Sequence, residues 1–113
     1  MNGSRVLVLG VAYKQDIDDY RESPALRVIE ELEKTGASVT FYDPYISEYR
    51  YHGKSHKGEA ALSAGLLRNT DLVVVTTAHT NVDYDFVQRY AHAVFDTKNV
   101  MKAVAVRTNI EVL

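Results

Sequence analysis

The chain has 113 residues, of which 46% are hydrophobic and 25% charged, with a formal net charge of -2. This length fits one compact domain around a single core and leaves no room for two. Because cysteine is absent, the composition excludes a disulfide framework, a thiolate zinc site and a thiol nucleophile. A net acidic chain lacks the basic excess of nucleic-acid modules. No apolar run approaches the roughly 20 residues of a membrane span. We therefore predict a cytoplasmic protein without nucleic-acid or membrane partners.

The first part of the chain predicts a β-α-β unit. Residues 1–4 are typical of a tail left by cloning as well as of a short natural N-terminus, so the domain is taken as residues 5–113. Residues 5–10 form a nearly continuous apolar run closed by glycine, which predicts a strand buried on both faces. Ser23 and Pro24 supply an N-cap and a first-turn proline for a helix that ends at Gly36. Residues 38–42 predict a second, parallel strand.

The remainder continues this alternation. Residues 43–57 lose the periodic pattern and are predicted to be a long connection. Apolar spacing then predicts a helix at 59–67, a strand at 71–76, a helix at 83–90 and a strand at 93–96. A helical turn at 99–103 and a terminal strand or tail at 104–112 follow. The fold class is therefore α/β, a three-layer Rossmann-like sandwich with a mostly parallel sheet. With its strands numbered along the chain, we predict the order 3-2-1-4-5.

Three cations follow predicted strands at one edge of this sheet. In open parallel sheets, ligands bind beyond the carboxyl ends of the strands where the order reverses, here between the strands at 5–10 and 93–96. Lys14 and Arg21 follow the first of these strands, and Lys98 follows the second. Together with the helix N-terminus at Ser23, they indicate a site for phosphate or pyrophosphate. Solvated loop charges are an equally good interpretation at this point.

Other chemistries are less well supported by the same segments. The loop after the first strand lacks the Gly-x-Gly-x-x-Gly that brings a dinucleotide close to the backbone, so this loop is not expected to bind NAD. Asp19 is predicted to orient Arg21 or simply to form a loop salt bridge. The histidines are interpreted as surface residues, and no metal site is predicted because two of them share a loop without a third ligand. They are His52, His56, His79 and His92.

Four motifs give the chain a family resemblance. They are GVAYK at residues 10–14, DDYRESP at 18–24, YDP at 42–44 and FDTKN at 95–99. In order and spacing they resemble the C-terminal domain of UDP-glucose and GDP-mannose dehydrogenases, from about residue 5 to about residue 101. The DTKN wording and the Thr77-Ala78-His79 segment look more like the UDP-N-acetylhexosamine branch than the UDP-glucose branch.

The resemblance implies a UDP-sugar-binding domain within a larger, homo-oligomeric NAD-dependent 6-dehydrogenase that oxidises the sugar C6 alcohol to a carboxylate. It assigns Tyr13 and Lys14 to the UDP-sugar and Arg21 to the NAD, which is held mainly by a separate N-terminal domain. Lys98 stands where many members have a substrate-holding arginine, and lysine lacks the bidentate fork of arginine. No catalytic residue falls in this chain, so it is expected to be inactive alone. A stand-alone nucleotide-sensing module and a subunit-contact domain are the alternatives.

Overall fold

The computed structural model describes residues 3–14, 16–21, 23–98 and 109–112. Its centre is a parallel sheet in the order β2-β1-β5-β6-β7. The predicted α/β class with a mostly parallel sheet is confirmed. In sheet order the strands are Ser38–Tyr42, Arg5–Leu9, Leu72–Val75, Val94–Asp96 and Ile110–Val112.

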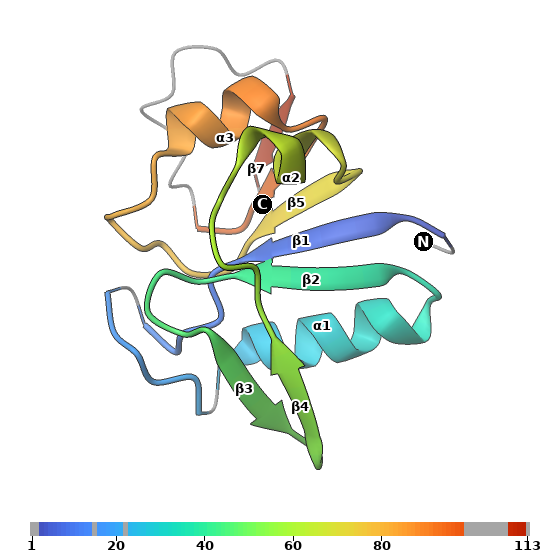
Figure 1. Ribbon diagram of the computed structural model, residues 1–113, viewed down its shortest axis with the longest axis vertical. Coiled ribbons are helices and arrows are strands. Elements are labelled where there is room, and N and C mark those ends of the chain that lie inside the picture. The colour runs from blue at the N-terminus through green and yellow to red at the C-terminus, as the bar shows by residue number, and fades with distance from the viewer. Residues whose placement is uncertain (1–2, 15, 22, 99–108, 113) are drawn as a thin grey trace.

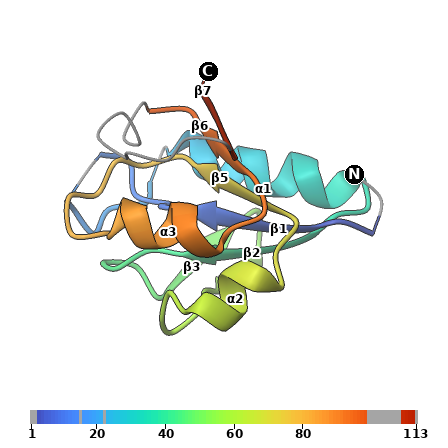
Figure 2. The ribbon, with the colours of Figure 1, turned by 90° about the horizontal axis from the view of Figure 1, so that it is seen from above.

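Helices cover the two faces of this sheet and make three layers. Helix α1 (Pro24–Lys34) lies on one face, and α2 (Ala64–Arg68) and α3 (Tyr84–Tyr90) lie on the other, as Figure 2 shows. Alternate residues of β1 point to opposite layers, since Leu7 and Leu9 pack with α2 and α3 while Val8 packs against α1. This double burial is the reason that β1 is apolar at nearly every position.

The predicted strand order is wrong. Taken along the chain, the five parallel strands run 2-1-3-4-5 in space rather than 3-2-1-4-5. The physical reason is burial: β2 alternates and leaves most of its residues half-exposed, whereas Val73, Val74 and Val75 in β5 are buried. A strand buried on both faces takes a central place, so β5 pairs with β1 and β2 becomes the edge. The switch point therefore lies between β1 and β5.

The predicted connection at 43–57 is partly a β-hairpin. Strands β3 (Glu48–Tyr51) and β4 (Lys54–Lys57) pair antiparallel and project beside α1 (Figure 1). The turn is His52-Gly53, both with positive φ, as in a two-residue hairpin turn. Tyr49 faces inward and is only 2% exposed, packed against the rings of Phe41 and Tyr20.

The structure tests the boundaries of two predicted helices but not a predicted turn. The helix after Ser23 is confirmed, since the Ser23 side chain caps it and the chain leaves it through Gly36 at φ 91°. The helix predicted at 59–67 begins only at Ala64, because Glu59 is held against β2 by an N–H donated to the Phe41 carbonyl at 2.8 Å. The turn predicted at 99–103 lies outside the described residues, as does most of the segment 104–112.

Candidate functional site

The carboxyl ends of β1, β5 and β6 surround a pocket of about 330 Å³. The loop after β1 supplies one wall, the residues directly after β5 form the floor, and the residue two positions beyond β6 supplies the opposite wall. Its described lining residues are Tyr13, Lys14, Thr76, Thr77, Ala78 and Lys98. These lining residues include two ammonium groups and no carboxylate, so the pocket favours an anion.

Lys14 and Lys98 thus share one hollow although their strands are not neighbours in the sheet. Lys14 follows β1 and Lys98 follows β6, and β5 runs between these two strands. The backbone N–H of Lys98 donates to the Asp96 carboxylate at 3.0 Å, which fixes the turn that carries the lysine. Both side chains are exposed and therefore accessible to a ligand.

Tyr13 gives the pocket an aromatic rim. Its side chain is 48% exposed, and the Lys14 ammonium lies 5.9 Å from the centre of its ring. An exposed tyrosine ring beside a cation presents a flat apolar face next to a positive charge. This combination suits a ligand that joins a phosphate to a ring.

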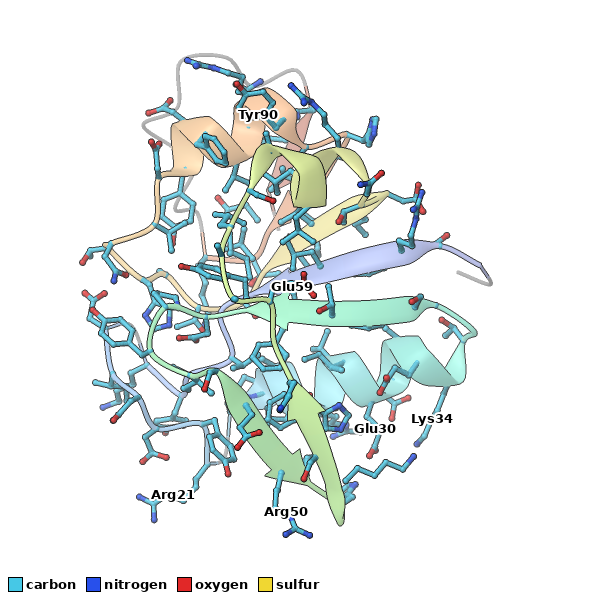
Figure 3. All side chains as sticks on the ribbon, viewed as in Figure 1. Arg21, Glu30, Lys34, Arg50, Glu59 and Tyr90 are labelled. Carbon is cyan, nitrogen blue, oxygen red and sulfur yellow. The ribbon has the colours of Figure 1, made fainter. Side chains whose placement is uncertain are left out.

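Arg21 lies apart from this pocket. Its guanidinium contacts the Asp19 carboxylate at two points, with Nε to Oδ1 at 3.1 Å and NH2 to Oδ2 at 3.0 Å. This contact fits both interpretations of Asp19, and it lowers the pKa of the Asp19 carboxyl below its ordinary value. The side chain of Arg21 is 83% exposed and points away from the body of the molecule (Figure 3). Of the three predicted cations, the structure brings only Lys14 and Lys98 together.

Thr77 packs closely against the backbone at Gly10. The φ of Gly10 is 91°, and an added Cβ would meet Thr77 Cβ at 2.5 Å and the Thr77 carbonyl oxygen at 2.9 Å. Thr77 therefore leaves no room for a side chain at this position. The loop after β1 also lacks the glycine motif that brings a dinucleotide close to the backbone.

Hydroxyl groups of the β5 loop fasten the loop after β1 to the floor of the pocket. Thr76 donates to the Gly10 carbonyl, and Thr77 donates to the Ala12 carbonyl at 2.9 Å. Ser23, the cap of α1, donates to the same Ala12 carbonyl at 3.3 Å. The segment before Tyr13 is consequently tied to two layers of the fold.

A buried histidine, His79, also holds this loop. The sequence analysis interpreted His79 as a surface residue, and that interpretation is wrong. His79 is 1% exposed, and its Nε2 lies 2.8 Å from Oδ2 of Asp43, which is also buried. Asp43 belongs to the YDP motif after β2, and His79 follows β5. Their positions just beyond the carboxyl ends of β2 and β5 were the available signal, but the sequence alone did not pair the two residues.

The fold is a doubly wound α/β domain, a class that commonly binds nucleotides, with a lysine-lined pocket at the switch point of its parallel sheet. The sequence matches the UDP-binding domain of the UDP-glucose/GDP-mannose dehydrogenase family over residues 7–103. The chain belongs to this family. No helix within the described residues is long and apolar enough to cross a membrane.

Similar proteins agree with this membership. A UDP-N-acetyl-D-mannosamine dehydrogenase of Methanocaldococcus jannaschii is 33% identical over 86% of this chain and 23% of its own length. A UDP-glucose 6-dehydrogenase of Haloferax volcanii is 38% identical over 68% of this chain and 18% of its own length. The solved NDP-N-acetyl-D-galactosaminuronic acid dehydrogenase of Methanosarcina mazei aligns with 99% of this chain and 24% of its own, at 27% identity and a TM-score of 0.75. The chain spans less than a quarter of the length of these curated relatives.

Proposed function

We propose that this chain binds the UDP-sugar in an NAD-dependent nucleotide-sugar 6-dehydrogenase. The observation that carries the proposal is the pocket shared by Lys14 and Lys98, rimmed by Tyr13. In this proposal the two ammonium groups hold the diphosphate, and Tyr13 packs against the attached sugar or base. Family membership supplies the choice of UDP among anionic nucleotides.

Hydride transfer is assigned to parts of the enzyme that this chain does not contain. NAD, when bound, accepts the hydride that leaves the sugar C6. The missing glycine motif after β1 supports a cofactor site on a separate domain. Arg21 is proposed to reach toward that cofactor, supported by its outward direction and its two-point contact with Asp19. This chain then contributes binding and orientation, and no catalytic group.

The substrate is proposed to be a UDP-N-acetylhexosamine rather than UDP-glucose, in a cytoplasmic, homo-oligomeric enzyme of surface polysaccharide synthesis. Relatives named UDP-N-acetyl-D-mannosamine dehydrogenase, which match 86% of this chain, support this preference. The substrate preference is tested by an assay of NADH production. A dehydrogenase chain that carries this domain together with the NAD domain is given a panel of UDP-hexoses and UDP-N-acetylhexosamines. Turnover of UDP-glucose alone would overturn the preference.

The binding test uses the 113-residue chain itself. Titration with UDP, followed by calorimetry or amide chemical shifts, is expected to show weak binding that Lys14→Ala and Lys98→Ala each weaken about ten-fold, because a charge-assisted hydrogen bond is worth about 1.5 kcal/mol. Lys34→Ala is the matched control, since Lys34 pairs with Glu30 and Glu31 on α1. No response to UDP, or a Lys14→Ala variant that binds like the wild type, would favour a subunit-contact domain instead.

A further inference from the structure

His79 and Asp43 form a buried pair whose hydrogen-bonding atoms reach the loops after three strands. His79 Nε2 contacts Asp43 Oδ2 at 2.8 Å, and the backbone N–H of Asp16 donates to His79 Nδ1 at 2.8 Å. The ring of Tyr45 packs on the imidazole at 4.9 Å between centroids. The His79 side chain is 1% exposed and that of Asp43 is fully buried.

These hydrogen-bond partners determine which nitrogen of the His79 imidazole carries the proton. A backbone N–H can only donate, so Nδ1 is the unprotonated nitrogen. In the neutral ring the proton then sits on Nε2 and is donated to Asp43. A single ring therefore presents an acceptor to the loop after β1 and a donor to the loop after β2.

Asp43 uses both carboxylate oxygens in the same way. Oδ2 accepts the N–H groups of Val11 and Ala12 at 2.8 and 3.1 Å, in addition to His79. Oδ1 accepts the N–H of Tyr45 at 2.8 Å and holds its own turn. A buried carboxylate with this many donors fixes each donor in direction.

Hydrogen bonds to this pair hold the loop after β1 on both sides of Tyr13 and Lys14. Ala12 lies just before Tyr13 and Lys14, and Asp16 lies just after them. Asp16 has φ 60°, which a non-glycine residue adopts only where its surroundings hold it. Besides His79, the holding contacts come from Thr80, whose N–H and Oγ1 each reach the Asp16 carboxylate at 2.8 Å.

We propose that His79 and Asp43 are positioning residues of the UDP-sugar site, setting where Tyr13 and Lys14 stand at the pocket. This inference rests on the proposed UDP-binding function. Neither residue lines the pocket, so their effect on a ligand passes through the loop that they hold. A ligand pocket tolerates little displacement of its binding groups, so an anchor lost from the loop lowers affinity even in a folded chain.

Two substitutions of His79 each keep one of the two imidazole hydrogen bonds and remove the other. His79→Gln can place an amide N–H near the position of Nε2 and keep the bond to Asp43, but it removes the acceptor for Asp16. His79→Asn can place an oxygen near the position of Nδ1 and keep the acceptor, but it loses the donor to Asp43. Each is expected to raise the Kd for UDP about three- to ten-fold, the effect of one lost hydrogen bond. His92→Gln is the control, since His92 is exposed and contacts the Arg68 carbonyl.

A double-mutant cycle with Lys14→Ala distinguishes positioning from general stability. If His79 acts by placing Lys14, His79→Gln causes little further loss of UDP affinity once Lys14 is alanine. Fully additive losses would overturn the inference. Histidine side-chain nitrogen spectra of the wild type supply an independent readout, and a proton on Nδ1 of His79 at neutral pH would also overturn it.

The possible outcomes distinguish failure of the positioning role from failure of the proposed UDP binding. A wild-type chain that gives no UDP response overturns both proposals. A wild type that binds, with Lys14→Ala weakened and both His79 variants unchanged, overturns only the positioning role. If the His79 variants fail to fold, Thr80→Val tests the Asp16 anchor from its exposed side, and it is expected to raise the Kd about three-fold. An unchanged Kd in Thr80→Val would then count against the inference.

Discussion

The loop after β1 and the β3–β4 hairpin are attached to the same body in opposite ways. The loop is held by directional hydrogen bonds from buried polar groups, chiefly Asp43 and His79. The hairpin is held chiefly by ring packing around Tyr49. Two exposed hydrogen-bond contacts add to this, His52 to Glu30 at 2.8 Å and the Arg50 N–H to the Tyr20 hydroxyl at 3.4 Å. Ring packing secures an element without fixing each atom, whereas hydrogen bonds fix direction. Directional contacts are therefore concentrated where side chains must meet a ligand.

The largest effect is expected from removing the central carboxylate. Asp43→Ala leaves the His79 donor and the N–H groups of Val11 and Ala12 without their buried acceptor. Breaking a buried polar pair in this way costs about 3–5 kcal/mol in the free energy of unfolding. Urea unfolding followed by circular dichroism measures it. A loss below about 1 kcal/mol would mean that the loop does not depend on directional contacts.

An intermediate, pH-dependent effect is expected at Tyr84, whose hydroxyl donates to the His79 carbonyl at 2.7 Å. Burial, followed by nearby carboxylates, raises the pKa of Tyr84 from its ordinary 10.0 to about 12. The folded state therefore favours the protonated phenol, and this stability is present below pH 10.0 and lost as the pH rises toward 12. Tyr84→Phe should lose about 1 kcal/mol near neutral pH and decline less steeply over that alkaline window. Parallel stability curves for the two proteins would contradict this assignment.

The smallest effect is expected at the hairpin. Glu30→Gln removes the charge that contacts His52, and that contact is the main reason that the pKa of Glu30 lies below its ordinary value. Because the pair is exposed, the substitution should leave Tm and UDP affinity unchanged at neutral pH. Thermal denaturation and a UDP titration check both points. A clear fall in UDP affinity would show that the hairpin, too, influences the pocket.

Local chemistry made much of the fold predictable. The apolar runs of β1 and β5, the Ser23 cap and the glycine after α1 each specify their element within a few residues. The hairpin was missed because its strands are short and their charged residues mask the alternation of Tyr49 and Tyr51. The strand order was missed because pairing depends on which strands are buried on both faces, a property of the whole assembly.

The candidate site was predictable only in part, for a related reason. Lys14 and Lys98 could be placed at one edge because parallel strands end on the same side of a sheet. Arg21 follows the same strand, yet the bond to Asp19 carries it to the outer surface. His79 and Asp43 meet across the sheet edge from positions 36 residues apart, and no local pattern announces such a pairing.

The pocket shared by Lys14 and Lys98 also links ligand binding to the folding equilibrium. The two ammonium groups come from opposite ends of the chain and meet only after β1, β5 and β6 have assembled, so an unfolded chain has no equivalent of this pocket. A ligand held there binds the native state alone and shifts the folding equilibrium by mass action. At a hundred-fold excess over its Kd, that shift amounts to about 2.7 kcal/mol. Occupancy by a nucleotide would thus protect the domain from heat and proteolysis.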